Sequence, residues 1–311
     1  MSDNKSQQKV SSKRILLSGL ITGSIARSIT HPVDTIKARM QVIRTKLNLS
    51  NLHQFGLIKT GMGTFHAEGI RGLYRGLGIN IVGGAPASAV FFYCFDQSKK
   101  LLARITGVNH SFMQSFLSGI MAEVVACLLF VPIDVIKERQ QVMTLMKSYN
   151  YKNSIDAIRQ IAKQEGVTSL YRAYGATILS FGPFTGISIA LYDKLKYWFG
   201  YDERSIAFHQ SLTLSALSGS VASIVTNPID VVKVRMQVQR AELKGSAPLS
   251  EGRFGYRNSL HGMKMLFNQE GFLGMFKGLS ARITFGIISS GLNLSINDYV
   301  KFTLLKDFDK H

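Results

Sequence analysis

The chain has 311 residues, of which 46% are hydrophobic and 18% are charged, and its formal net charge is +18. The mean hydropathy of +0.11 is low for a membrane protein, so a soluble helical repeat is the simplest alternative, and nucleic acid is a conceivable partner for so basic a chain. Cys94 and Cys127 lie in apolar segments without CxxC spacing, which excludes a disulfide framework and a CxxC metal site.

The first predicted elements are a polar tail over residues 1–12, expected to be disordered, and a helix over residues 13–43. The apolar run of this helix ends at Pro32, where the pattern Pro-x-Asp-x-x-Lys-x-Arg-x-Gln begins. A short amphipathic helix is predicted near residues 57–66. The segment Glu-Gly-x4-Tyr-Arg-Gly at residues 68–76 then opens a second long helix, which ends near Arg104.

The same order of elements recurs twice. Long helices are predicted over residues 111–146 and 205–240, and they repeat the proline motif at Pro132 and Pro228. A Gly-, Ser- and Pro-containing insertion at residues 243–255 is predicted to be a mobile loop. The Glu-Gly segments at 165–173 and 270–278 open helices that end near residues 200 and 306. Three motifs at nearly constant spacing indicate an internal triplication.

Acidic and basic side chains at the depth of these motifs are costly unless they are paired. Within one motif the Asp and the Lys are i, i+3 neighbours and can pair locally. Three copies around a centre also allow each Asp to meet the Lys of the next repeat, with a Gln one turn beyond each Lys as a brace. The predicted ring consists of Asp34 with Lys137, Asp134 with Lys233 and Asp230 with Lys37, braced by Gln41, Gln141 and Gln237.

A second charged triplet lies at the far ends of the even-numbered helices. The pattern is an aromatic residue followed by Asp-x-x-Lys, although Asn297 replaces the aromatic residue in the third copy. Each pair could be a local helix pair, but its threefold recurrence predicts another ring at that end of the molecule. Its members are Asp96, Lys99, Asp193, Lys196, Asp298 and Lys301.

Two features favour a membrane over a soluble repeat protein. The apolar runs are long and rich in Gly and Ser, as in packed membrane helices. The polar residues inside them recur at equivalent positions, as expected of side chains that line a water-filled cavity. The basic residues are spread over repeating helix ends, which favours an anionic phospholipid or solute over nucleic acid. We therefore expect no nucleic-acid partner.

These motifs resemble the signature of the mitochondrial carrier family over almost the whole chain. The resemblance implies an all-α membrane protein with six tilted transmembrane helices in three pseudo-threefold repeats, each with a short matrix helix, over residues 13–106, 107–203 and 204–311. It implies transport of a small molecule by alternating access, with the proline-motif ring as matrix gate and the second triplet as cytosolic gate. No cofactor is implied.

The resemblance also implies a place in the mitochondrial inner membrane, with both termini toward the intermembrane space, and function as a monomer. Cardiolipin is the implied lipid partner, bound where the even-numbered helices begin and a helix N-terminus faces phosphate. Ala173 replaces the expected Gly at one of these sites, which weakens it. The implied lipid-binding residues are Arg75, Gly76, Arg172, Ala173, Lys277 and Gly278.

Alignment of the repeats predicts the substrate contacts. Glu123 stands where the other repeats have Gly23 and Gly219, so it either meets the substrate or pairs with a neighbouring base. Cys127 is equally well explained as packed core. The candidate substrate-binding residues are Arg27, Asn80, Gly83, Gly84, Glu123, Cys127, Ser180, Phe181, Phe184, Ser223, Arg282 and Phe285.

Local resemblance within the family is to S-adenosylmethionine carriers, at residues 74–89, 122–128 and 183–184. It implies exchange of S-adenosylmethionine for S-adenosylhomocysteine. Three positions depart from those carriers, which have an acid at Arg27, an arginine at Ser180 and a base at Phe130. The alternative is therefore an anionic metabolite or nucleotide, held by Arg27 and Arg282.

Two other classes of protein were weighed. A carrier-like chain can serve as a structural subunit of a membrane complex, but the intact charged triplets argue against that role. An enzyme has no support, because the seven histidines form no HExxH pair and neither a P-loop nor a nucleophile elbow is present. His31 is expected to pack at the helix kink, and no metal site is predicted.

Overall fold

The computed structural model describes residues 23–43, 56–106, 112–146, 150–201, 207–239, 254–289 and 292, and these ranges contain helices and no strands. The sequence prediction of an all-α fold is confirmed. In chain order the helices are residues 23–42, α2 (Leu57–Leu73), α3 (Leu77–Thr106), α4 (Phe112–Met146), α5 (Ser154–Glu165), the 3-10 helix η2 (Val167–Tyr171), α6 (Tyr174–Trp198), α7 (Phe208–Val238), α8 (Ser259–Gly274) and Leu279–Ser289.

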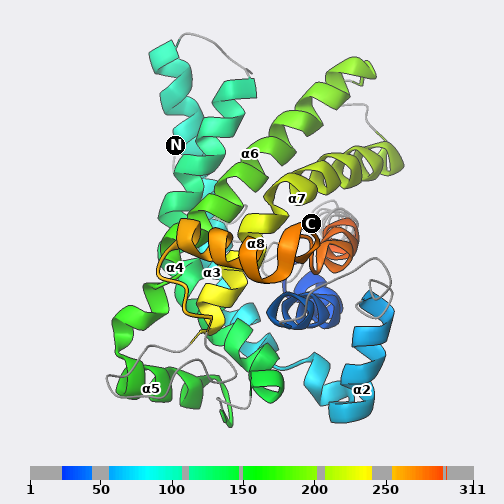
Figure 1. Ribbon diagram of the computed structural model, residues 1–311. Helices are drawn as coiled ribbons and strands as arrows, with labels where there is room; N and C mark the ends of the chain where they lie inside the picture. The colour runs from blue at the N-terminus through cyan, green and yellow to red at the C-terminus, as the bar shows by residue number, and fades with distance from the viewer. Residues whose placement is uncertain are drawn as a thin grey trace, which may run out of the picture.

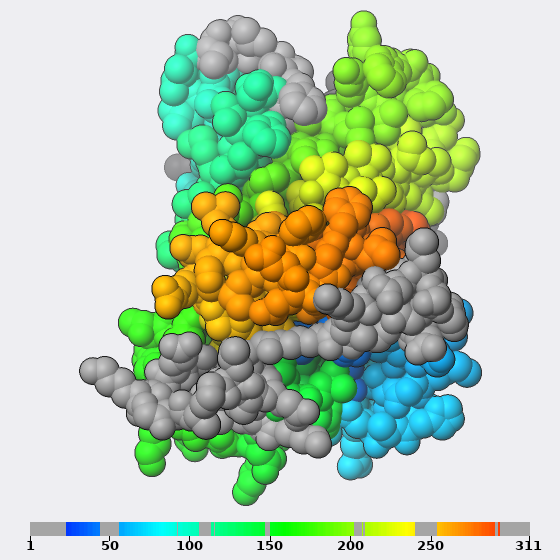
Figure 2. All heavy atoms as spheres, viewed as in Figure 1, coloured from blue at the N-terminus to red at the C-terminus, as the bar shows by residue number. Residues whose placement is uncertain are grey.

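The long helices form the body of the molecule, and α4 packs against both α3 and α6. Figure 1 shows the short helices α2 and α5 at the lower end and α8 across the front of α7. The upper ends of α3 and α4 diverge from those of α6 and α7 in Figure 1, and Figure 2 shows the surface hollowed between the two groups. The two ends of the bundle are therefore built differently.

Four of the described helical segments are long and apolar enough to span a membrane. The chain from Ser259 to Ser289 bends by 80° between α8 and the last described helix, so α8 lies at a steep angle to that helix. The predicted first and last helices are described only over residues 23–42 and 279–289. The four segments are Leu77–Ile105, Phe116–Met146, Val167–Trp198 and His209–Val238.

Glycine breaks the chain between each short helix and the long helix that follows it. The glycine of every Glu-Gly segment has a positive φ, which is 66° at Gly69, 81° at Gly166 and 73° at Gly271. A glycine adopts this conformation without the strain that a Cβ causes. Ala173 stands at the end of its Glu-Gly segment, where the other two repeats have Gly76 and Gly278. Its φ is −91° and it follows a 3-10 helix, so repeat 2 enters its long helix through a differently built turn.

The short helices of repeats 2 and 3 begin at asparagine caps that the sequence analysis did not identify. The Asn153 side chain accepts a hydrogen bond from the backbone N–H of Asp156, and Asn258 does the same for His261. Each cap satisfies a backbone donor that has no partner within the helix. Both caps lie in the sequence pattern Tyr-x-Asn-Ser, which could have been used to predict them. Phe254, which was assigned to the mobile loop, is buried; residues 243–253 lie outside the described ranges.

The buried apolar residues concentrate where the proline motifs converge. Val131 and Val135 of α4 pack with Val231 and Val234 of α7 in one cluster. Higher on the same helices the large apolar side chains face outward, as at Leu128, which is 52% exposed. A chain with its core at one end and apolar side chains on its outer surface is suited to a lipid environment.

Candidate functional site

The three proline motifs bring six charged side chains together, which we call the charged ring. All of them except Lys37 are buried, and Lys37 has a side-chain exposure of 14%. The three shortest ion pairs each join two different repeats and have the partners that the sequence predicts, while Lys137 also lies 3.9 Å from Asp134 of its own repeat. The closest approaches are 2.8 Å for Lys37 to Asp230, 3.0 Å for Lys137 to Asp34 and 3.0 Å for Lys233 to Asp134.

Glutamine braces only two of the three ring pairs. Gln41 donates a hydrogen bond to Asp230 Oδ2 at 2.9 Å, and Gln141 donates to Asp34 Oδ2 at 3.2 Å. Gln237 is also buried, but within the described ranges neither polar atom of its side chain has a hydrogen-bond partner, so the third expected brace is not formed. The Lys233 ammonium lies 3.7 Å from the centre of the Phe181 ring. The Asp134–Lys233 pair is therefore held by fewer polar contacts.

Two further charges adjoin the ring, and each belongs to one repeat only. Glu138 Oε1 lies 3.4 Å from Lys137 Nζ, and its position is Ala38 or Val234 in the other repeats. The sequence analysis missed Glu138, although this comparison of repeats would have found it. Arg282 Nε lies 3.8 Å from Asp230 Oδ2, and its guanidinium stacks over Phe184. The ring is therefore not symmetric.

A second set of ion pairs ties each long helix to the short helix of its own repeat. Arg39 contacts both carboxylate oxygens of Glu68, at 2.5 and 3.0 Å, and its Nε donates to the Gln141 carbonyl of the next repeat. Burial raises the pKa of Glu68, but hydrogen bonds from Arg39 and Thr144 outweigh it and leave the pKa below its usual value. The equivalent pairs are Arg139 with Glu165 and Arg235 with Glu270. These residues belong to the sequence motifs, but their ion pairs were not predicted.

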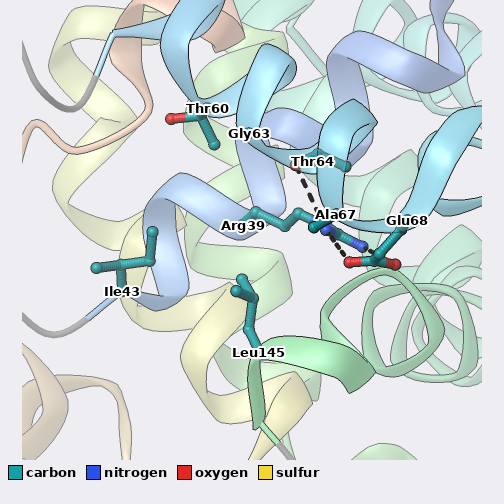
Figure 3. Close-up of a pocket in the computed structure, with 8 residues that line it drawn as sticks. All are labelled: Arg39, Ile43, Thr60, Gly63, Thr64, Ala67, Glu68 and Leu145. Carbon is teal, nitrogen blue, oxygen red and sulfur yellow. Dashed lines mark hydrogen bonds and ion pairs between the residues drawn. The ribbon is translucent and has the colours of Figure 1, made fainter.

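A pocket of about 170 Å³ opens beside the Arg39–Glu68 pair (Figure 3). Figure 3 shows the two charged side chains pointing toward each other, so the pocket presents no unpaired charge. None of the candidate substrate-binding residues lines it. Its lining residues are Arg39, Ile43, Thr60, Gly63, Thr64, Ala67, Glu68 and Leu145.

Arg27 is held by α3 through uncharged acceptors. Its guanidinium donates to both oxygens of Asn80, to the Gly84 carbonyl at 3.1 Å and to Ser88 Oγ at 2.8 Å. Among the described residues no carboxylate forms an ion pair with it. The positive charge of Arg27 is therefore fixed in position but not neutralised by a carboxylate.

A methyl group at Gly84 should disturb this arrangement. A Cβ there would overlap the Arg27 guanidinium, so Gly84→Ala should displace Arg27 without unfolding the chain, and it should raise severalfold the KM of the transport that the family resemblance implies. Gly78→Ala is the matched control, because a Cβ at Gly78 meets no atom within 4 Å. Uptake kinetics and thermal unfolding of both variants test this. Equal KM values would show that the Arg27 position does not matter.

The other candidate contacts divide into three groups. Phe184 and Arg282 stack on each other, and Ser180 Oγ donates to Asp230 at 3.3 Å. Glu123 and Ser223 are buried, and Phe285 is partly buried. Gly83 packs against Ile133, whose side chain lies 2.6 Å from where a Cβ would stand. Gly83 is therefore a position of close packing between α3 and α4, and its contact with substrate stays a prediction.

Comparison with known proteins places these features in a family. A family model described as mitochondrial carrier protein matches residues 8–106, 108–203 and 204–308. The chain belongs to the mitochondrial carrier family. It is therefore a transporter of the multi-pass inner-membrane type, and an enzyme is not supported.

The relatives of this carrier differ in the substrates that their names give. Mitochondrial substrate carrier family protein E of Dictyostelium discoideum is 31% identical over 96% of this chain and 98% of its own length. The mitochondrial adenyl nucleotide antiporter of Homo sapiens is 31% identical over 94% of this chain, which spans 58% of that protein. The succinate/fumarate mitochondrial transporter of Saccharomyces cerevisiae is 28% identical over 92% of this chain and 89% of its own length. None of these names mentions S-adenosylmethionine.

The second charged triplet of the carrier is not arranged like the first. Asp96 forms an ion pair of 2.5 Å with Lys100 of its own helix, and both side chains are more than half exposed. This is neither a pair between repeats, as the predicted ring requires, nor the local pair with Lys99. Asp193 is exposed, and Asp298 and Lys301 lie outside the described ranges. The carrier therefore has ion pairs between repeats at the proline-motif end, and Asp96 takes no part in such a pair at the other end.

The basic residues of the predicted lipid sites differ in exposure. Lys277 is buried, and its ammonium donates to Glu270 at 2.5 Å and to the Ile43 carbonyl at 2.8 Å. The Lys277 side chain is therefore held inside the protein, and the predicted lipid site there consists of the helix N-terminus. Arg75 has a side-chain exposure of 29% and pairs with Glu68, while Arg172 is exposed. The three sites are not equivalent.

Proposed function

We propose that this carrier exchanges an anionic metabolite or nucleotide across the inner membrane by alternating access. The observation that carries the proposal is the state of Arg27, whose guanidinium is oriented by neutral acceptors and unpaired with any described carboxylate. A fixed, unneutralised cation inside a membrane protein suits an anionic ligand. Adenine nucleotides and dicarboxylates, which relatives are named for, both belong to this class.

Arg282 supplies a second cation with an adjacent aromatic ring. Its guanidinium stacks on Phe184, and its Nη1 is buried without a hydrogen-bond partner among the described residues. Arginine recognises phosphate and carboxylate through paired donors. Because Arg282 also lies 3.8 Å from Asp230 of the charged ring, a bound anion competes with a ring member for the same guanidinium. Substrate binding is thereby linked to ring closure.

In this mechanism the charged ring is the closed matrix gate. The substrate must stabilise the intermediate between the two states enough to offset the cost of breaking the ion pairs. A ligand shifts a conformational equilibrium only by the difference between its affinities for the states. The exposed Asp96–Lys100 pair belongs to the open side. When the matrix gate opens, the second triplet forms the cytosolic gate. The termini face the intermembrane space, cardiolipin binds at the starts of the even-numbered helices, and the carrier works as a monomer.

S-adenosylmethionine remains the competing substrate, because the buried carboxyl of Glu123 could meet its sulfonium or amino group. A thermal-shift screen separates the two. ADP or succinate should stabilise the purified carrier, and Arg27→Gln should remove that stabilisation when the liganded and unliganded melting temperatures of the same variant are compared. Exchange of labelled ADP and succinate in proteoliposomes completes the test. Stabilisation by S-adenosylmethionine alone would contradict an anionic substrate.

A further inference from the structure

Glu123 occupies a position that points into open space in the other two repeats. It lies nine residues before the motif proline, where Gly23 and Gly219 stand. A Cβ built on either glycine meets no atom within 4 Å. Repeat 2 alone therefore places a carboxyl group in this space, and the side chain is only 4% exposed.

The surroundings of Glu123 offer little to a negative charge. Its Oε1 accepts a hydrogen bond from the Cys127 thiol at 3.3 Å, and a thiol is a weak donor. No base among the described residues lies within ion-pair distance of it. On α6 the nearby titratable group is Tyr174, whose hydroxyl donates to the Val124 carbonyl, and on the 23–42 helix Arg27 is held by α3.

Two charged groups act electrostatically on Glu123, namely Asp134 of its own helix and Lys233 of α7. Lys233 is already committed to Asp134 at 3.0 Å. With the ring closed, Lys233 is thus paired with another acid. A buried carboxyl without a cation is stable in its neutral form. Opening the ring separates Lys233 from Asp134 and frees its ammonium, the one base that acts on Glu123 among the described residues.

We propose that Glu123 carries one proton in each transport cycle, so that anion exchange is coupled to proton movement. With the ring closed, the carboxyl holds a proton taken from water on the open side. When the ring opens, the O–H bond breaks, the proton passes to matrix water, and the carboxylate pairs with the freed Lys233. Closing the ring returns Lys233 to Asp134, and Glu123 takes up the next proton. This inference rests on the proposed alternating access.

The protonation of Glu123 can be measured without any substrate. Infrared spectra of the purified carrier at neutral pH should contain the carbonyl stretch of a protonated carboxylic acid, and Glu123→Gln should remove it. Cys127→Ser provides a stronger donor to the carboxylate, so it should move the midpoint of this band to lower pH than Cys127→Ala does. Absence of the band, its survival in Glu123→Gln, or equal midpoints in the two Cys127 variants would overturn the proposal.

Coupling is then measured in proteoliposomes loaded with a pH dye, with ADP and succinate as probes. The wild-type carrier should move one proton for each anion exchanged, and the residual exchange of Glu123→Gln should move none. Anion exchange without proton movement in the wild type would overturn the proposal and leave the proposed function intact. If neither anion moves while the carboxylic-acid band is present, the proposed function fails and the protonated Glu123 stands.

Discussion

Reversing Asp134 to lysine should abolish exchange in proteoliposomes, and adding Lys233→Asp to the same chain should restore a measurable part of it. The single change places two ammonium groups where the structure has an ion pair of 3.0 Å between buried side chains. Breaking a buried pair by altering one partner costs about 3–5 kcal/mol. The double change recreates the attraction with its direction reversed. Uptake by the wild type, both single variants and the double variant measures the rescue.

The matched control reverses the charges of Lys37 and Asp230 in the same way, first singly and then together. Asp230 also accepts a hydrogen bond from Gln41 and faces Arg282, so a lysine there would lose one partner and repel another. The Asp134–Lys233 pair lacks a glutamine brace. Rescue should therefore be clearly greater at Asp134–Lys233. Equal rescue at both pairs would contradict the asymmetry of the ring, and full activity of Asp134→Lys alone would contradict the pairing.

Removing Arg235 should cause the largest loss of stability. Its side chain is fully buried, contacts both oxygens of Glu270 and donates to the Gln41 carbonyl at 2.8 Å. Arg235→Ala should lower the stability by about 3 kcal/mol, at the low end for a buried ion pair that loses one partner, because Lys277 remains beside Glu270. Arg235→Lys should recover little of this, because an ammonium cannot make the paired contacts of a guanidinium. Thermal unfolding in detergent measures both effects.

Arg75→Ala is the control for this comparison. Arg75 has a side-chain exposure of 29% and contacts Glu68, which keeps Arg39 as its partner when Arg75 is removed. A partly exposed pair of this kind contributes about 1 kcal/mol or less. Similar losses of stability for Arg75→Ala and Arg235→Ala would show that burial and paired geometry do not set the strength of these contacts.

The features that follow threefold repetition could be predicted from the sequence. The nearly constant spacing of the proline motifs predicted the long helices. It also predicted the partners in the charged ring, because a repeated pattern of charges around one centre allows few pairings. Comparison of the repeats could also have predicted the ion pair of Arg235 with Glu270, since the same Arg and Glu-Gly positions recur in every repeat. The sequence therefore predicts the features that are the same in all three repeats.

The departures from symmetry could not be predicted in this way. Gln237 occupies the same motif position as Gln41, but among the described residues its side chain has no hydrogen-bond partner, although the motif aspartate is present in every repeat. In the proposed mechanism the pairing of Asp96 with Lys100 belongs to one of two states, and a sequence encodes both states at once. Gly83 and Gly84 are neighbours, yet only Gly84 accommodates Arg27. Such differences depend on packing rather than on the motif.

In the proposed mechanism the ring must open for a solute to pass, and cross-linking the ring tests this most directly. In a chain with Cys94 replaced by serine and the buried Cys127 retained, cysteines at positions 134 and 233 can be joined by a short, reducible bifunctional thiol reagent. The cross-linked carrier should lose exchange in proteoliposomes, and a reductant should restore it. Exchange that continues at the same rate with the two residues joined would contradict the ring as the matrix gate.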